Sequence, residues 1–350
     1  MTDLDLAERE LEKGELVEET MIINMGPQHP STHGVLRLVL ELDGETVVSA
    51  RPVIGYLHTG IEKNTEVRSW QQGVTLVTRA DYLSPFFNEM AYCMAVERLL
   101  GIEAPPRAQV IRVIASELNR IASHLVWLAT SGLELGAVSI MIYGFRARET
   151  ILDVFEAITG LRMNHAYMRV GGLSMDLPLD GVDRIRGLLK TLPDQIGEFE
   201  TLLSNNPIWI ERNKGVGVLT QEQLRAWNVT GPPLRAGGIA RDVRKDEPYG
   251  IYDAFDFEVP TSTDSDCFAR YLIRIEEMRQ SLRIVEQALD NLPEGPVMVQ
   301  DPKVKWPAEL EVGPDGIGNS EAYVKHIMEE SMEALIHHFK MVTEGFAVPA

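Results

Sequence analysis

The sequence has few cysteines and a deficit of positive charge, and each shortage excludes a class of function. Only two cysteines, Cys93 and Cys267, occur among 350 residues, and they lie far apart in the chain. By themselves they cannot build a disulfide framework, a zinc site or an iron–sulfur site, and they fit a reducing compartment. Acidic residues outnumber basic ones 52 to 33, which gives a net charge of −19. We therefore expect no nucleic-acid partner, because phosphate contacts need clustered Lys and Arg.

Motifs of several common enzyme classes are also missing. No GxGxxG follows a predicted strand and no GxxxxGK[ST] occurs, so we expect no nucleotide binding by this chain. There is no GxSxG nucleophile elbow. Residues 1–20 are acidic, whereas a secretory signal begins with a basic region, so this stretch predicts an acidic N-terminal tail.

One segment, residues 125–145, has about the length of a membrane span. Glu134 lies near its middle, between Gly132 and Gly136. A carboxylate at the centre of a bilayer costs roughly 3 kcal/mol on insertion scales. We therefore expect a buried helix, a glycine-broken turn and a second buried segment.

The stretch GPQHPSTHGVLR, residues 26–37, carries two histidines, His29 and His33. Their spacing would place both rings on one face of a helix, but Pro30 lies between them and disfavours helical geometry. The residues predict a rigid turn, with Gly34 leading into the next strand. Two interpretations stay open: the imidazoles cap backbone groups, or they handle protons, since histidine titrates near neutral pH.

Hydrophobic patterning predicts an α+β fold that is mainly a helical bundle. Residues 36–42 alternate in polarity, Asp43 and Gly44 supply a hairpin turn, and residues 46–53 form the return strand. Apolar residues at intervals of three and four between 111 and 128 predict a packed helix. Further helices are expected at residues 62–72, 145–159, 179–203 and 265–291.

The same patterns divide the chain into parts. After the tail we expect an N-terminal β region at 21–61, a helical core at 62–206 and a C-terminal helical part at 263–350. Between the last two, residues 207–262 are rich in Gly, Pro, β-branched and aromatic residues and predict a small mixed α+β insertion with short strands.

Charged residues also occur on the packed helix between 111 and 128. Glu117, Arg120 and His124 share one face of it. A solvated ion-pair cluster is the simplest interpretation of such a triplet. The alternative is that a helix this apolar is buried on all sides.

Eight strings occur in order over residues 21–346 and together closely resemble the D subunit of NADH:quinone oxidoreductase, respiratory complex I. They are GPQHPSTHGVLR, GYLHTGIEK, RADYLS, APPRAQVIRVIASELNRIASHL, MRVGG, NPIWIERNKGVGV, LRAGGIARDVRK and HHFKMVTEGF. The resemblance implies a fold like the large subunit of nickel–iron hydrogenases. Where those enzymes carry Arg-x-Cys-x-x-Cys, this chain has Asp81 and Ser84 in place of the thiolates, so we expect no metal.

The resemblance implies that a quinone head group binds between His33 and Tyr82. Quinone reduction takes two electrons and two protons, and an imidazole and a phenol offer one donor to each carbonyl oxygen. Glu134 stands where the family usually has an aspartate coupled to the histidine, and a carboxylate there favours the protonated ring. These three residues are the expected catalytic groups.

Other positions are assigned by the same resemblance. His29, His58, Asp81 and His165 are expected to line the quinone pocket or to lie near the partner's cluster. Many relatives have a histidine where this chain has Asn164, and His165 follows it; some have arginine at Thr59.

The implied function is electron transfer from a partner's terminal 4Fe–4S cluster to ubiquinone or menaquinone, coupled to proton pumping. Partners implied are chains of the B, C, I (ferredoxin-like) and membrane H types, with FMN and the iron–sulfur clusters in partner subunits and no cofactor on this chain alone. The expected location is the cytoplasmic side of the cell membrane, as a peripheral subunit. Alternatives are a non-catalytic scaffold, a related ferredoxin- or F420-dependent complex, and a hydrogenase-like enzyme.

Overall fold

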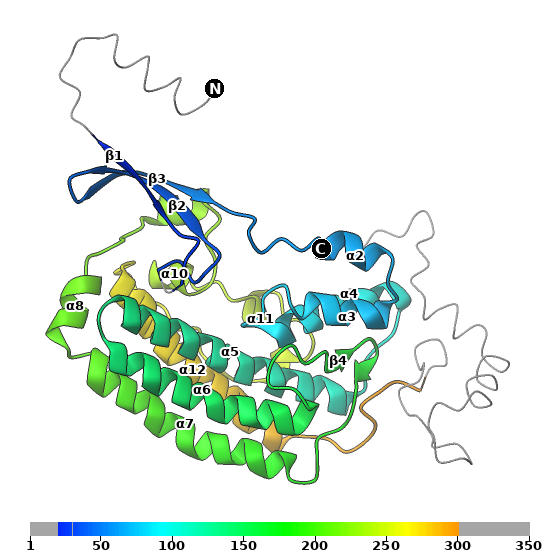
Figure 1. The fold of residues 1–350 in the computed structure, drawn as a ribbon. Coiled ribbons are helices and arrows are strands. Elements are labelled where there is room, and N and C mark those ends of the chain that lie inside the picture. The colour runs from blue at the N-terminus through cyan, green and yellow to red at the C-terminus, as the bar shows by residue number, and fades with distance from the viewer. Residues whose placement is uncertain (1–19, 30, 301–350) are drawn as a thin grey trace. The chain divides into compact units, whose positions relative to one another are not determined.

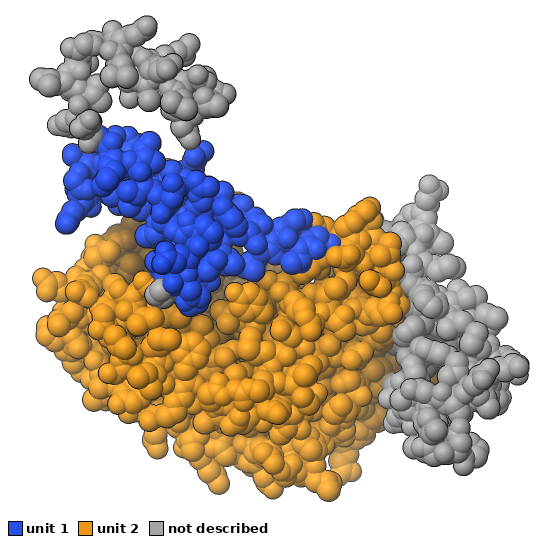
Figure 2. All heavy atoms as spheres, in the orientation of Figure 1, with its two compact units in different colours: residues 1–60 blue, residues 61–350 orange. Residues whose placement is uncertain are grey.

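The computed structural model describes residues 20–29 and 31–300, which belong to two compact units, 1–60 and 61–350 (Figures 1 and 2). Residues 1–19 of the predicted acidic tail, Pro30, and the predicted C-terminal helical part beyond residue 300 lie outside the described residues. The described chain is mostly helical with small sheets, so the predicted α+β class is confirmed. The finer division of the helical part at 206 and 262 stays a prediction.

Unit 1 contains a three-stranded antiparallel sheet in the order β1-β2-β3. Its strands are β1 (Met21–Met25), β2 (Arg37–Asp43) and β3 (Thr46–Val53). Asp43 pairs with Thr46, so the hairpin turn is Gly44-Glu45, one residue later than expected, with Gly44 at φ +58°. The hairpin of β2 and β3 is confirmed. Sequence patterns did not identify β1.

Four long helices of unit 2 form a bundle (Figure 1). They are α5 (Pro106–Glu134), α6 (Val138–Thr159), α7 (Gly181–Leu203) and α12 (Cys267–Asp290). Helix α5 contacts α6 and α12, and α7 contacts the same two helices, which closes the bundle. The predicted apolar positions of α5 are at most 1% exposed, which confirms them as core: Ile111, Ile114, Leu118, Ile121, Leu125 and Leu128.

The turn between α5 and α6 is the glycine-broken turn expected within residues 125–145. Gly136 has φ +87°, a conformation that L-residues avoid, and the amide of Ala137 donates to the carbonyl of Gly132 at 2.7 Å. In the part of the chain that the structure describes, no helix is both long and apolar enough to cross a bilayer.

Shorter elements flank the bundle helices along the chain. Among the described residues, three helices precede the bundle: α2 (Ile61–Glu66), α3 (Trp70–Val77) and α4 (Pro85–Leu100). Two-residue strands β4 (Met168–Arg169) and β5 (Gly172–Leu173) follow α6. Between α7 and α12 lie α8 (Pro207–Asn213), α9 (Gln221–Ala226), α10 (Pro232–Ala236), α11 (Val243–Asp246) and the 3₁₀ helix η1 (Tyr252–Ala254).

The predicted short strands at 207–262 are wrong, because every regular element of that segment is helical. N-cap side chains or prolines lie at the N-termini of these helices. Asn206, Thr220 and Asp242 each accept a backbone amide at a helix N-terminus, while Pro232 begins α10. The segment therefore satisfies its backbone groups through short helices and side-chain contacts instead of strand pairing.

The packing of α6 on α5 makes Gly144 a sensitive position. A Cβ there would lie 2.8 Å from the Ala129 Cβ and 3.2 Å from the Leu125 carbonyl oxygen. Gly144→Val should lower the free energy of unfolding by about 1–3 kcal/mol through overpacking, measured by urea denaturation. Gly187→Ala on α7 is the matched control, because nothing lies within 4 Å of the added Cβ; it should stabilise by up to about 1 kcal/mol. Equal stability of the two variants would contradict the close α5–α6 approach.

Candidate functional site

The histidine turn of unit 1 joins β1 to β2 and has the turn conformation expected from sequence at its described residues. Thr32 is buried beneath it; its amide donates to the Gln28 carbonyl at 2.9 Å, and its hydroxyl accepts from the Gln28 amide at 2.9 Å. The exposed rings of His29 and His33 lie 6.0 Å apart, edge to face. The turn therefore presents two imidazoles from a fixed backbone. His58, also exposed, follows β3.

Tyr82 lies in unit 2, on the loop between α3 and α4, and is 42% exposed. Buried Asn119 of α5 holds this loop: its Nδ2 donates to the Leu83 carbonyl at 2.8 Å, and its Oδ1 accepts from the Phe86 amide at 3.1 Å. Asn88 also donates to the carbonyl of Asp81 at 2.9 Å. The phenol is thus presented by a loop whose backbone is tied to two helices.

Glu134 is exposed at the last position of α5. It lies 15 residues beyond Asn119 on the same helix, or about 22 Å along the axis at 1.5 Å per residue. Within unit 2 the structure therefore does not bring Glu134 to the Tyr82 loop. The pairing of His33 with Tyr82 or with Glu134 joins residues of different units and stays a prediction.

His165 is a buried ring, 5% exposed, in the loop after α6. It stacks on Phe86 with ring centroids 4.1 Å apart, and its Nε2 lies 3.0 Å from the Arg162 carbonyl oxygen. Because a carbonyl only accepts, Nε2 carries the proton, and the buried Nδ1 has no partner among the described residues. Burial lowers the pKa of His165 to about 4, so the ring is neutral at physiological pH.

A cavity of about 640 Å³ opens beside Asp81, entirely within unit 2. Its walls come from the Tyr82 loop, α5, α10 and the segment around α11. The charged and titratable side chains that line it include Asp81, Arg120, His124, Arg235, Asp242 and Arg244. Convergent polar groups in a concave site are the usual mark of a functional pocket.

Behind this cavity lies Glu117, which is 0% exposed. It accepts from Arg120 at 3.1 Å, from Arg244 at 3.0 Å, and from the hydroxyls of Tyr252 and Ser281 at 2.7 Å each. Burial alone would raise the pKa of Glu117, but the Arg120 and Arg244 guanidiniums hold it well below its usual range. Glu117 is therefore a permanent anion of the core.

Glu277 of α12 forms a second buried carboxylate centre. Its oxygens receive the Arg235 guanidinium at 2.7 Å and face His124 Nε2 at 2.8 Å. Burial opposes ionisation, but His124 and Arg235 lower the pKa of Glu277 to about 2. The solvated interpretation of the Glu117, Arg120 and His124 triplet is thus wrong, and the alternative of a helix buried on all sides fits. Helical spacing in the sequence identifies the triplet. No local sequence pattern indicates that Arg235, Arg244 and Glu277 join it in the fold.

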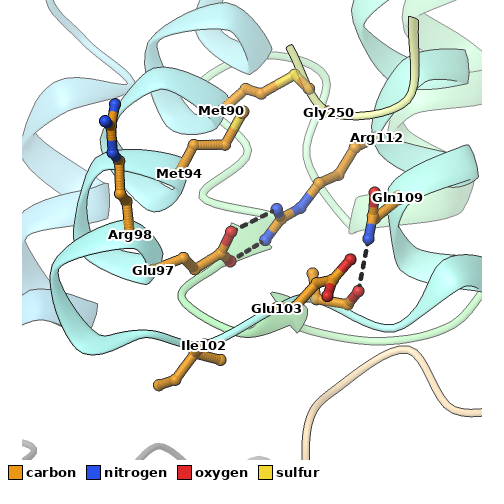
Figure 3. A pocket seen from close by; sticks show the side chains of 10 residues that line it. Met90, Met94, Glu97, Arg98, Ile102, Glu103, Gln109, Arg112 and Gly250 are labelled. Carbon is orange, nitrogen blue, oxygen red and sulfur yellow. Dashed lines mark hydrogen bonds and ion pairs between the residues drawn. The ribbon is translucent and has the colours of Figure 1, made fainter. Parts of the chain in front are cut away.

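A smaller pocket of about 240 Å³ lies beside α4 and contains none of the predicted site residues (Figure 3). Glu97 and Arg112 face each other in it, with Nη2 and Oε1 2.6 Å apart, both buried. Among the described residues, no three side chains of His, Cys, Asp or Glu come together so that they could hold a metal ion.

Comparison with known proteins gives consistent matches. Residues 134–350 match the family model described as the 49 Kd subunit of respiratory-chain NADH dehydrogenase. The chain is 63% identical over 333 residues to the D subunit of NADH-quinone oxidoreductase from Acidothermus cellulolyticus, covering 95% of this chain and 76% of that protein. It is 61% identical to the proteins of the same name from Nocardia farcinica (95% and 74% covered) and Frankia casuarinae (96% and 70% covered).

The Glu277 centre predicts how stability depends on pH. Glu277→Gln should lower the free energy of unfolding at pH 7 by about 3 kcal/mol, since it leaves Arg235 buried without its counter-ion. The pKa of Glu277 falls from its ordinary 4.5 to about 2 in the folded chain. The extra free energy of unfolding of the wild type over Glu277→Gln is therefore present above pH 4.5 and is lost as the pH falls toward 2. Urea unfolding at several pH values measures it.

The matched control is Glu198→Gln, which removes a carboxylate paired with Arg146 at the surface. That change should cost at most about 1 kcal/mol at any pH. A Glu277→Gln penalty as small as that of the control would contradict the buried ion pair.

Proposed function

The chain belongs to the family of the D subunit of NADH-quinone oxidoreductase, and on that premise we propose that it reduces a membrane quinone in the assembled complex. Electrons arrive from the terminal iron–sulfur cluster of a partner subunit, and reduction is coupled to proton translocation. Identity above 60% to three relatives of this name, over at least 95% of the chain, is the observation that carries the proposal.

Tyr82 and His33 are the residues proposed to hold the quinone head group. Each carbonyl oxygen gains negative charge as electrons arrive, so a donor within hydrogen-bond reach stabilises that charge and supplies a proton. The exposed Tyr82 phenol and its backbone, fixed by Asn119, support this role, because a preorganised donor loses little freedom when the quinone binds. His33, on its own fixed turn, supplies the second donor.

The remaining predicted residues take supporting roles in this proposal. Glu134 stabilises the protonated ring of His33, while His29, His58 and Asp81 line the approach of the quinone. His165 is neutral and stacked on Phe86, so its role is to fix the loop that faces the partner's cluster rather than to exchange protons.

The same proposal also implies the fold of unit 2, the partner chains, the location and the substrate. The frame of unit 2 is that of a nickel–iron hydrogenase large subunit with Asp81 and Ser84 in place of thiolates. The partners are chains of the B, C, I and H types. They carry the iron–sulfur clusters or make the contact with the membrane. The chain works as a peripheral subunit at the cytoplasmic face of the cell membrane, with ubiquinone or menaquinone as substrate and FMN on a partner.

The test uses Tyr82→Phe and His33→Ala in the assembled complex. Removing one general acid–base group should lower NADH:quinone reductase activity by about 10²-fold or more, because such groups contribute 10²–10⁴-fold. NADH oxidation by an artificial acceptor should stay at the wild-type rate, since it draws electrons before the quinone site.

Tyr271→Phe is the matched control, because its buried hydroxyl contacts Ser204 at 2.9 Å and none of the proposed site residues. It should leave quinone reduction unchanged. Full quinone reductase activity in both Tyr82→Phe and His33→Ala would leave a non-catalytic scaffold as the role of this chain.

A further inference from the structure

The cavity beside Asp81 contains a histidine that the proposed quinone chemistry does not use. His124 lines this cavity from α5, and its side chain is 13% exposed. Its Nε2 lies 2.8 Å from a Glu277 carboxylate oxygen. An ionised carboxylate only accepts, so Nε2 carries the proton, and the lone pair of the neutral ring is on Nδ1. Nδ1 makes no hydrogen bond with the described residues.

The groups around the ring set its charge. Glu277 of α12 faces it directly, Arg120 lies one turn earlier on α5, Arg274 lies on α12, and Arg235 of α10 binds the same Glu277. Asp81, Asp242 and Arg244 belong to the other walls of the cavity. Burial lowers the pKa of His124, as do Arg274 and Arg120, although Glu277 opposes the change. The ring is therefore neutral at rest, with a carboxylate ready to stabilise its cation.

Arg120 supplies a second group on the same face that is open to the cavity. Its Nε and Nη2 bind Glu117, whereas its Nη1 has no partner among the described residues. Since residues four apart on a helix are neighbours, a guanidinium donor and an imidazole acceptor stand side by side at the cavity wall. Such a pair suits a space that gains negative charge and then takes up a proton.

We propose that this cavity is a proton-loading chamber, in which His124 takes one proton from a hydronium ion of the solvent in the cavity, leaving water, whenever negative charge develops at the neighbouring Tyr82 loop. The new N–H bond forms at Nδ1 of His124, and Glu277 stabilises the imidazolium. Arg120 stabilises the negative charge that draws the proton into the cavity. As Tyr82 is reprotonated, His124 gives its extra proton back to a water molecule of the cavity, which leaves as hydronium, and no electron passes through His124 or Arg120. Asp81 lines the cavity and directly precedes Tyr82 in the chain, so the cavity wall and the phenol belong to the same loop.

This inference rests on the proposed function, and chemical rescue tests it separately. His124→Gln in the assembled complex keeps an N–H for Glu277 but cannot take up a proton; it should lower quinone reduction by about tenfold or more. His124→Ala should be similarly slow and should recover when imidazole is added. Rescue by substituted imidazoles should vary with the pKa of the added base, which a space-filling role would not produce. NADH oxidation by an artificial acceptor reports that each variant is assembled.

The outcomes separate the two proposals. Wild-type quinone reduction by His124→Gln, or rescue that follows only the size of the added base, overturns the proton-loading chamber while Tyr82→Phe and His33→Ala remain inactive. Full activity of Tyr82→Phe and His33→Ala instead overturns the proposed function, whatever His124→Gln shows.

Discussion

One buried carboxylate, Glu117, joins four elements of unit 2, and the cavity wall depends on it. Arg120, Arg244, Tyr252 and Ser281 donate to it from α5, α11, η1 and α12. A charge with no access to water is tolerated only when it is paired and fully hydrogen-bonded. Residues 241–254 have only short helices, so these contacts fix their position against the bundle.

Two buried carboxylates of α4 hold neighbouring segments in place, and one of them, Glu89, supports the Tyr82 loop. Glu89 and Glu97 lie eight residues apart, on one face of the helix. Glu89 accepts the Thr78 hydroxyl at 2.7 Å, just before the loop, and also the backbone amides of Ala166, Tyr167 and Met168. Glu97 binds Arg112 and the Gly171 amide. The phenol and the segment carrying His165 therefore share one rigid support.

Local signals in the sequence predicted much of this frame. Pro106 and Gly160 mark the start of α5 and the end of α6, and alternation marks β2 and β3. The helix expected at 62–72 is two helices, since Ser69 and Gln72 form a capping box that starts α3. The helix expected from 145 begins at Val138, because the turn uses only three residues after α5.

The charged part of the site could not be predicted in the same way. Arg244 and Glu117 are 127 residues apart in the chain, and each alone resembles a solvated surface charge. Only the folded bundle brings them together, and no helical or strand period encodes such a pairing. The Tyr82 loop was found because a family motif marks it, but its supports, Asn119 and Glu89, have no local signal.

The most direct measurement is a structure of the assembled complex with a quinone or a quinone-site inhibitor bound. We predict that the Tyr82 hydroxyl and the His33 ring both lie within hydrogen-bond distance of the head group, with Asn119 still bonded to the Tyr82 loop. A head group bound elsewhere, with Tyr82 covered by another subunit and no hollow between phenol and imidazole, would contradict it.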